Sequence, residues 1–299
     1  MSNTAVKTSS GKRVIAKRRW WTGLMDFFRR LSKNKGAFIS MFFLIIVVLA
    51  CIFADVISPY DYAKMDLIHK LEFPSWQHIC GTDNNGRDIF TRILYGGRIS
   101  LLVSVISVAI ATVIGPIFGA LAAFYGGRTD GVIMRLLDVI MSIPGLLLSV
   151  SISIALGTGT VQTAIAIAVG SIPSMARVMR AQVLTEKDKE YVEAARAAGA
   201  TDARIILTHI LPNCVAPLIV QATMRIGSSV LLISSLSFIG CGIQPPTPEW
   251  GSMVSAGRQY VRTFYPMVLF PGLAIMITML AFNLFGDGVR DALDPKLRR

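Results

Sequence analysis

The chain has little charge, few histidines and few cysteines, and each shortage excludes a class of protein. Charged residues make up only 16% of its 299 residues, hydrophobic residues make up 53%, and the mean hydropathy is +0.57. These values exclude an ordinary soluble domain. The four cysteines, Cys51, Cys80, Cys214 and Cys241, lack metal-type spacing, and the three histidines stand apart. We therefore expect no metal site.

Catalytic motifs are also missing. No G-x-x-x-x-G-K-[ST] pattern occurs, and Gly11-Lys12 lacks the upstream glycine of a phosphate-binding loop. No nucleophile triad or carboxylate pair stands out for hydrolysis. We therefore expect no catalytic residue and no cofactor in this chain, which predicts that it is not an enzyme by itself.

What the chain does contain is a set of long apolar runs. Runs of about 20 residues cross the roughly 30 Å hydrocarbon core of a bilayer as helices, because backbone groups in lipid must be satisfied within the segment. We predict an all-α, polytopic membrane protein with about six transmembrane helices. Pro144, Gly145 and Pro173 interrupt the third and fourth. The predicted spans are 37–57, 99–125, 132–156, 161–183, 214–240 and 266–286.

Basic residues predict the orientation of these spans. If the N-terminal tail lies in the cytoplasm, six spans return the C-terminus to the same side, and 22 of the 30 Lys and Arg residues become cytoplasmic. This agrees with the positive-inside rule. We therefore expect a basic cytoplasmic tail (1–36), a first span with an external segment (37–98), a five-helix core (99–286) and a cytoplasmic C-terminal tail (287–299).

The net charge of +12 follows from this topology and needs no nucleic acid to explain it. Trp20, Trp21, Phe27 and Phe28 among the basic residues of the tail predict an amphipathic helix on the lipid surface. Cys80 and Cys241 are both expected near the external face, so a disulfide between them is conceivable, but the sequence does not give the geometry that decides it.

A polar segment at 184–213 separates the fourth and fifth predicted spans and reads as two short helices. An apolar stripe at positions i, i+3, i+4 and i+7 marks the first helix: Tyr191, Ala194, Ala195 and Ala198. Gly199 stands where a left-handed stop residue is expected. Thr201 or Asp202 can cap the second helix, which we expect Pro212 to end. Small alanines with a charged rim suit a helix that enters a groove.

The pattern Glu193-Ala194-Ala195, then Gly199 and Leu211-Pro212, resembles the cytoplasmic EAA loop of ABC importer permeases. The resemblance implies that this loop docks into a groove on a separate ATPase. It implies contacts from the EAA residues, from Gly199 and Asp202, and from Leu211-Pro212. His209 departs from the aliphatic residue that the family places three positions before the proline. A connector that only caps two membrane helices is the structural alternative.

Three further blocks resemble the dipeptide, oligopeptide, glutathione and nickel branch of these permeases, and most of all the second, C-type permease of dipeptide importers. The blocks are 81–88 with residues 92–100, 244–251, and 286–295. The resemblance implies a type I importer permease fold in the bacterial inner membrane. It also implies four partners: a homologous permease, two ATPases that bind the ATP and magnesium, and an external solute-binding protein. It leaves the substrate open among dipeptide, longer peptide, glutathione and nickel.

A charged side chain inside a membrane span costs free energy, so such a residue is a candidate for a functional role. Arg225 lies near midplane and either faces the transport pathway, where it meets a peptide carboxylate, or pairs with an acid. For Asp138 we expect a pair with Arg135 or with a neighbouring helix. Glu249 and Trp250 follow a proline cluster on the outer side. Either they contact the binding protein or they pack against the adjacent external segment.

Glycines and short acidic runs have structural interpretations. Gly115, Gly119, Gly126 and Gly127 predict close helix contacts. Asp83-Asn-Asn-Gly86 does not match the spacing of a calcium loop and predicts a capped turn onto a short interfacial helix.

Two other functional classes compete with the permease. A self-contained secondary transporter predicts internal repeats and membrane acids, and neither is evident. A membrane-anchored DNA-binding regulator predicts a compact soluble domain, which is missing.

Overall fold

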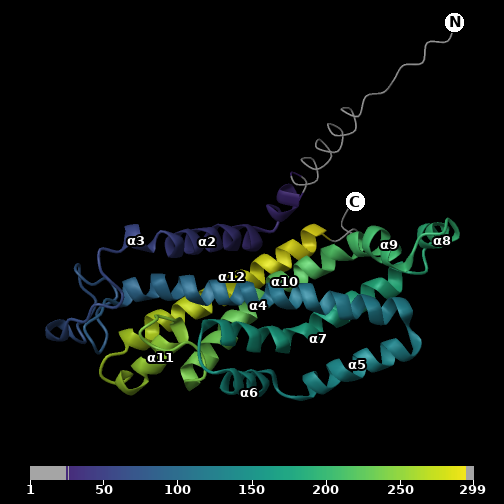
Figure 1. Ribbon diagram of the computed structural model, residues 1–299. Coiled ribbons are helices and arrows are strands. Elements are labelled where there is room, and N and C mark those ends of the chain that lie inside the picture. The colour runs from purple at the N-terminus through teal and green to yellow at the C-terminus, as the bar shows by residue number, and fades with distance from the viewer. Residues whose placement is uncertain (1–24, 26, 294–299) are drawn as a thin grey trace, which may run out of the picture.

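A computed structural model of the chain describes residues 25 and 27–293, and these form an elongated bundle of helices (Figure 1). The amphipathic helix expected at 1–36 falls mostly outside these residues. The helices are, in chain order, α2 (Lys35–Ile52), α3 (Ala54–Ile57), η1 (Leu67–His69), α4 (Ile89–Tyr125), α5 (Gly127–Ser142), α6 (Gly145–Leu156), α7 (Thr160–Glu186), α8 (Glu190–Ala197), α9 (Asp202–Arg204), η2 (Ile205–Ile210), α10 (Leu211–Ile239), α11 (Trp250–Gly257), η3 (Arg258–Tyr260) and α12 (Pro266–Leu293).

Five described helical runs are long and apolar enough to cross a membrane, and α5 with α6 forms a sixth crossing only as a pair bent by 90°. The sequence predicts one span over 132–156 that is interrupted at Pro144 and Gly145, and the bend lies at this interruption. The break lies at Ile143-Pro144, where Ile143 is extended with φ −90° and ψ 128°. Proline removes a backbone donor and disfavours helical geometry in the residue before it, so the chain turns here.

Two helices extend beyond the predicted spans. α4 begins at Ile89, ten residues before the expected start at 99, because the Asp88 side chain accepts a hydrogen bond from the backbone N–H of Thr91 (2.7 Å) and caps the helix. At the other end of the chain, α12 continues through 287–293, which the sequence assigned to the C-terminal tail. Hydropathy marks the apolar part of a helix and misses these polar turns.

Small residues set the distance between the two central helices, α4 and α7. A Cβ added at Gly119 would lie 2.1 Å from the Ala176 carbonyl oxygen, and one at Gly115 would lie 2.6 Å from Met175 Cβ. The packing role predicted for these two glycines is confirmed. It is wrong for Gly126 and Gly127, which face open space and have φ values of +63° and +50°. They form the turn between α4 and α5, where glycine adopts positive φ without strain.

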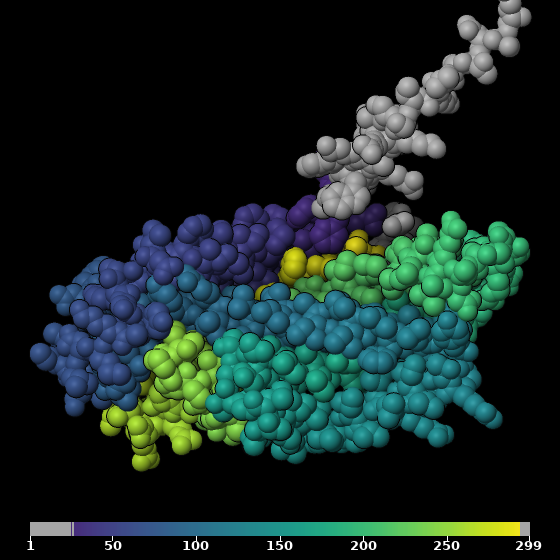
Figure 2. All heavy atoms as spheres, in the orientation of Figure 1, coloured from purple at the N-terminus to yellow at the C-terminus, as the bar shows by residue number. Residues whose placement is uncertain are grey.

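The bundle has two unlike ends (Figure 1). One end carries α8 and α9, and the start of α2 and the end of α12 point toward this end without reaching it. The opposite end carries the segment 58–88 and α11, which pack against each other and against α4. In the space-filling view, α8 and α9 protrude at their end of the molecule, whereas the 58–88 segment forms a broad mass at the other (Figure 2).

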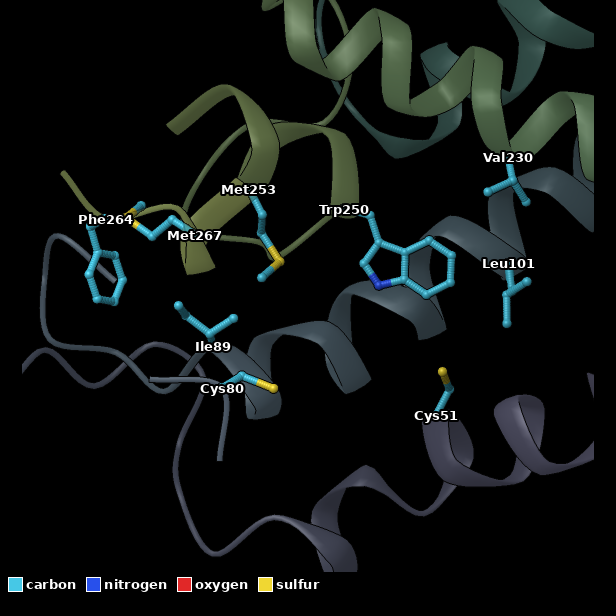
Figure 3. Close-up of a cluster of buried hydrophobic side chains, with 9 residues drawn as sticks. All are labelled: Cys51, Cys80, Ile89, Leu101, Val230, Trp250, Met253, Phe264 and Met267. Carbon is cyan, nitrogen blue, oxygen red and sulfur yellow. The ribbon is translucent and has the colours of Figure 1, made fainter. Parts of the chain in front are cut away.

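A buried cluster fixes the end that carries α11 (Figure 3). Trp250 lies at its centre and is 1% exposed. Its indole N–H donates to the Ile93 carbonyl oxygen of α4 (2.9 Å). Cys80 belongs to this cluster, whereas Cys241 packs against a different one. All four cysteines are free thiols, so the disulfide left open between Cys80 and Cys241 is absent from this structure.

Candidate functional site

Residues 184–213, here called the coupling segment, form a compact module at one end of the bundle. Its first helix, α8, stops at a left-handed glycine, Gly199, with φ +77°. The Gly199 N–H donates to the Arg196 carbonyl oxygen (3.0 Å) and the Ala200 N–H donates to that of Ala195 (3.1 Å). This pair of bonds is the Schellman pattern of helix ends. The predicted role of Gly199 as a stop residue is confirmed.

A buried residue that the sequence analysis missed holds α8 in place. Val192 is 0% exposed and packs in one cluster with Ile205, Ile210 and Cys214. It lies off the predicted alanine stripe, so periodicity did not single it out. The available signal was its size, because Val192 is the only aliphatic residue larger than alanine in α8.

The residues expected to dock lie on the open side of this anchor. Glu193, Ala194 and Asp202 are exposed, whereas Ala195 is half-buried against the Val192 cluster. Among the described residues, the Glu193 carboxylate forms no ion pair and no hydrogen bond. The fold therefore presents a small-residue face with a free carboxylate on its rim, supported from behind by a packed core.

The second half of the coupling segment differs from the prediction. Thr201 precedes α9, but neither its side chain nor that of Asp202 caps the helix. Pro212 does not end a helix, because α9, η2 and α10 form one helical run from Asp202 to Ile239. The run is widened over Ile205–Ile210 into a π-helix, in which the Leu211 N–H donates to the Ile206 carbonyl oxygen. Pro212, which has no N–H to offer, follows at the first turn of α10, where proline is tolerated.

Polar contacts join the two halves of the coupling segment. The Tyr191 hydroxyl hydrogen-bonds the Glu186 carboxylate and accepts a bond from the Asn213 amide (3.2 Å). Lys189 also bonds the Glu186 carboxylate, at 2.5 Å, and this bond raises the pKa of the Lys189 ammonium above its ordinary value. Burial and the Glu186 bond together raise the pKa of Tyr191. At neutral pH, Lys189 therefore stays charged and the Tyr191 hydroxyl keeps its proton.

Four charged side chains of α5 and α7 form ion pairs between these two helices, whereas Arg225 of α10 forms none with the described residues. Asp138 of α5 pairs with Arg177 of α7 at 2.5 Å, so its partner lies on a neighbouring helix, as one of the two alternatives predicted, and not at Arg135. Asp130 and Arg180 form a second bridge between the same helices, with two bonds of 2.6 Å. The guanidinium of Arg225 on α10 has no ion-pair partner in the described part of the chain.

Glu249 and Trp250 do not project outward. They are 0% and 1% exposed, respectively, so the predicted contact with a binding protein is wrong and the packing alternative holds. The Glu249 carboxylate accepts hydrogen bonds from the hydroxyls of Ser100 and Ser234 (3.2 Å each). It also caps α11 by accepting from the Ser252 N–H (2.9 Å). These two residues fasten α11 to α4 and α10.

The segment 81–88 forms a capped turn, as predicted. Asp83 accepts backbone hydrogen bonds from Asn85 and Arg87, and its carboxylate lies 2.7 Å from the Arg87 guanidinium. Arg92 approaches the same carboxylate at 3.6 Å. The Asp83 carboxylate is thus paired with cationic side chains. Among residues 25 and 27–293, no three His, Cys, Asp or Glu side chains lie close enough together to hold a metal ion.

Comparison with known proteins agrees with this architecture. Residues 115–299 match the family described as binding-protein-dependent transport system inner membrane component. The chain belongs to this family. Residues 23–74 match the N-terminal transmembrane domain of oligopeptide transport permease C. The chain is thus a membrane subunit of an ABC importer and a multi-pass inner-membrane protein, which removes the two competing classes, the secondary transporter and the DNA-binding regulator.

Curated relatives cover nearly the whole chain. A di/tripeptide transport system permease protein of Pseudomonas aeruginosa is 43% identical, over 92% of this chain and 93% of its own length. A dipeptide transport system permease protein of Haemophilus influenzae is 42% identical, over 93% and 96%. A glutathione transport system permease protein of Escherichia coli is 44% identical, over 91% and 90%.

Among solved structures, an inward-facing MetNI methionine ABC transporter has a similar fold, with a TM-score of 0.57 at 21% identity over 68% of this chain and 97% of the other. This likeness confirms the predicted type I importer permease fold.

Proposed function

We propose that this chain forms one half of a transmembrane pathway for dipeptides and other short peptides, in an importer driven by two separate ATPases. A homologous permease supplies the other half, and an external solute-binding protein delivers the substrate. The observation that carries the proposal is the coupling segment, in which a buried core presents an exposed Glu193-Ala194 face at one end of the bundle. Relatives of similar length carry names of peptide transport systems.

The ATPases dock on the exposed face of α8 in this proposal. Glu193 and Asp202 supply the charged rim, and Ala194 allows close approach to a groove. Gly199 and the Leu211-Pro212 pair keep the two halves of the coupling segment in register. ATP and magnesium are bound by the ATPases, since this chain has no phosphate-binding loop.

The end of the bundle that carries α8 faces the cytoplasm in this proposal. The start of α2 and the end of α12 lie toward the same end (Figure 1), so both termini are cytoplasmic and the positive-inside rule is satisfied. The segment 58–88 and α11 then face the outside, where they receive the solute-binding protein. In this proposal the chain has four functional parts: the cytoplasmic tail 1–36, the first span with its external segment (37–98), the permease core 99–286 and the cytoplasmic tail 287–299.

The test is uptake of labelled substrates by the assembled complex in proteoliposomes. We expect ATP-dependent accumulation of a dipeptide, competed by unlabelled di- and tripeptides. Glutathione is the second candidate, because a glutathione permease is 44% identical to this chain. Accumulation of glutathione or nickel with no uptake of dipeptide would contradict the peptide assignment and leave the importer assignment standing.

A further inference from the structure

Arg225 occupies an unusual position for a cation. It lies midway along α10, fourteen residues from Leu211 and fourteen from Ile239. Its side chain is half-buried, and within the described residues it has no ion pair and donates no hydrogen bond. Arg177 and Arg180 of α7, by contrast, both pair with aspartates of α5. A guanidinium in the middle of a membrane-spanning helix costs free energy unless an anion pairs with it. An anionic ligand would supply this partner for Arg225.

Arg225 lines an open cavity of about 240 Å³, whose wall mixes leucines with polar side chains. Four serine hydroxyls line it together with the guanidinium: Ser171, Ser228, Ser229 and Ser235. Two of these hydroxyls already donate hydrogen bonds to backbone, Ser228 to the Arg225 carbonyl oxygen (3.0 Å) and Ser235 to that of Leu231 (2.8 Å). Those of Ser171 and Ser229 form no hydrogen bond with the described residues. The cavity therefore offers one cation and two free hydroxyl donors.

A second, apolar cavity adjoins the first. It has a volume of about 410 Å³ and shares Leu146, Leu231 and Ser235 with the Arg225 cavity. Phe238, Ile239, Val254 and Ile275 form much of the rest of its wall. A site for a charged group thus lies beside a site for an apolar one, with α10 forming one wall of both.

We propose that Arg225, with the Ser171 and Ser229 hydroxyls, binds the terminal carboxylate of a peptide in transit, and that the adjoining cavity receives the side chain of the same terminal residue. The proposal rests on the proposed peptide transport. Charge-assisted hydrogen bonds from a guanidinium suit a carboxylate particularly well. A cavity of this size holds a carboxylate with several waters, because one water occupies roughly 30 Å³. It therefore selects for the charged end of the substrate without requiring a particular side chain.

The test compares a dipeptide with its C-terminal amide, which lacks the charge. Uptake of both is measured in proteoliposomes holding the complete complex, with wild-type chain and with Arg225→Gln. The solute-binding protein is the same in both complexes, so its own preference cancels when the two acid-to-amide uptake ratios are divided. We expect Arg225→Gln to lower the acid-to-amide ratio at least tenfold, mainly by slowing uptake of the free acid.

Further variants separate a binding role from a structural one. Arg225→Lys keeps the charge and should retain most of the acid-to-amide ratio. Ser171→Ala and Ser229→Ala should each lower it by a few-fold. Thr223→Val is the matched control on the same helix, because the Thr223 hydroxyl bonds its own backbone at Ile219 and lines a different groove. It should leave the ratio unchanged.

Three results would count against the proposal in distinguishable ways. If the Arg225→Gln complex assembles and keeps the wild-type acid-to-amide uptake ratio, the guanidinium does not bind the peptide carboxylate. Loss of the assembled complex with Arg225→Gln, but not with Thr223→Val, would show that Arg225 pairs with an acid of another subunit. A wild-type complex that takes up neither peptide would reject the proposed function, and this subsite with it.

Discussion

At the scale of single residues, Gly199 makes the sharpest prediction. Its φ of +77° disfavours every residue with a Cβ, and most of all a β-branched one, while no atom within 4 Å would obstruct a side chain. Gly199→Val should therefore cost about 1–3 kcal/mol of local strain and displace the second half of the coupling segment. We expect fewer ATPase subunits in a pull-down with the tagged permease, at unchanged membrane levels.

Gly199→Asn is the matched control, because asparagine tolerates left-handed geometry far better than valine does. It should retain the ATPases nearly as well as the wild type. Equal loss with both variants would show that the side chain obstructs a docking partner, and equal retention would show that the turn is not needed.

Glu193 tests the charged rim of α8. Its carboxylate is exposed and has no ion pair in the described part of the chain, so reversing its charge breaks nothing within the subunit. Glu193→Lys should weaken retention of the ATPases and lower transport, while membrane insertion and thermal stability of the permease stay unchanged. Asp188→Lys makes the same charge reversal just outside α8 and is the control. Normal transport by the Glu193 variant would contradict the docking face proposed here.

Cys80 offers a chemical test of the end opposite the coupling segment. Its thiol is only 7% exposed, and burial raises its pKa to about 11. Since the thiolate is the reactive form, roughly one thiol in a thousand is reactive at pH 8. Maleimide labelling read by mass spectrometry should be slow at Cys80 in the folded complex and fast after denaturation. The partly exposed Cys241 is the comparison within the chain, and labelling of Cys80 at an equal rate would contradict the packing in Figure 3.

At the scale of helices, the contact between α4 and α7 makes a prediction about stability. A methyl group at Gly119 would press on the α7 backbone, and overpacking of this kind costs about 1–3 kcal/mol. Gly119→Ala should lower the apparent Tm of the assembled complex by several degrees. Gly131→Ala is the control, because its Cβ would face open space inside α5 and alanine favours helix. A Tm unchanged by Gly119→Ala would mean that the two helices lie farther apart.

The sequence predicted helices more reliably than their ends and breaks. Long apolar runs identified each major helix, since crossing a bilayer imposes both length and composition. The sequence predicted an interruption at Pro144 and Gly145 but not the 90° bend found there, because a proline within an apolar run is compatible with a kink, a break or a continuous helix. The early start of α4 was missed for a related reason, since its first turns are polar and only the Asp88 cap defines them.

The candidate site was predictable only where a local rule applied. Gly199 followed from helix-stop chemistry, whereas Val192 required knowing which face of α8 meets the core. Glu249 and Trp250 looked exposed because they follow a polar, proline-rich loop. Their burial depends on serines far away in the sequence, Ser100 and Ser234. Burial that arises from such long-range contacts is not encoded in a local pattern.

At the scale of the whole molecule, one helical run connects the two proposed sites. Asp202 begins the run within the coupling segment, and Arg225 lies near its middle, before it ends at Ile239. At about 1.5 Å per residue, roughly 35 Å separate Asp202 from Arg225. The helical run gives the two proposed sites a continuous physical connection. The π-helix at Ile205–Ile210 is the place where that element departs from regular geometry.

The last prediction concerns what this chain does alone. ATP hydrolysis requires a phosphate-binding loop, which the sequence lacks, and concentrative uptake requires a source of free energy that biases one conformation over another. The purified chain in liposomes should therefore show neither activity. Adding the second permease, the two ATPases and the solute-binding protein should give both activities, and a complex with hydrolysis-deficient ATPases should assemble without uptake. Robust ATP hydrolysis by the single purified chain would contradict the assignment of the energy source to separate subunits. Peptide accumulation in the complex with hydrolysis-deficient ATPases would show instead that this fold couples transport to another gradient.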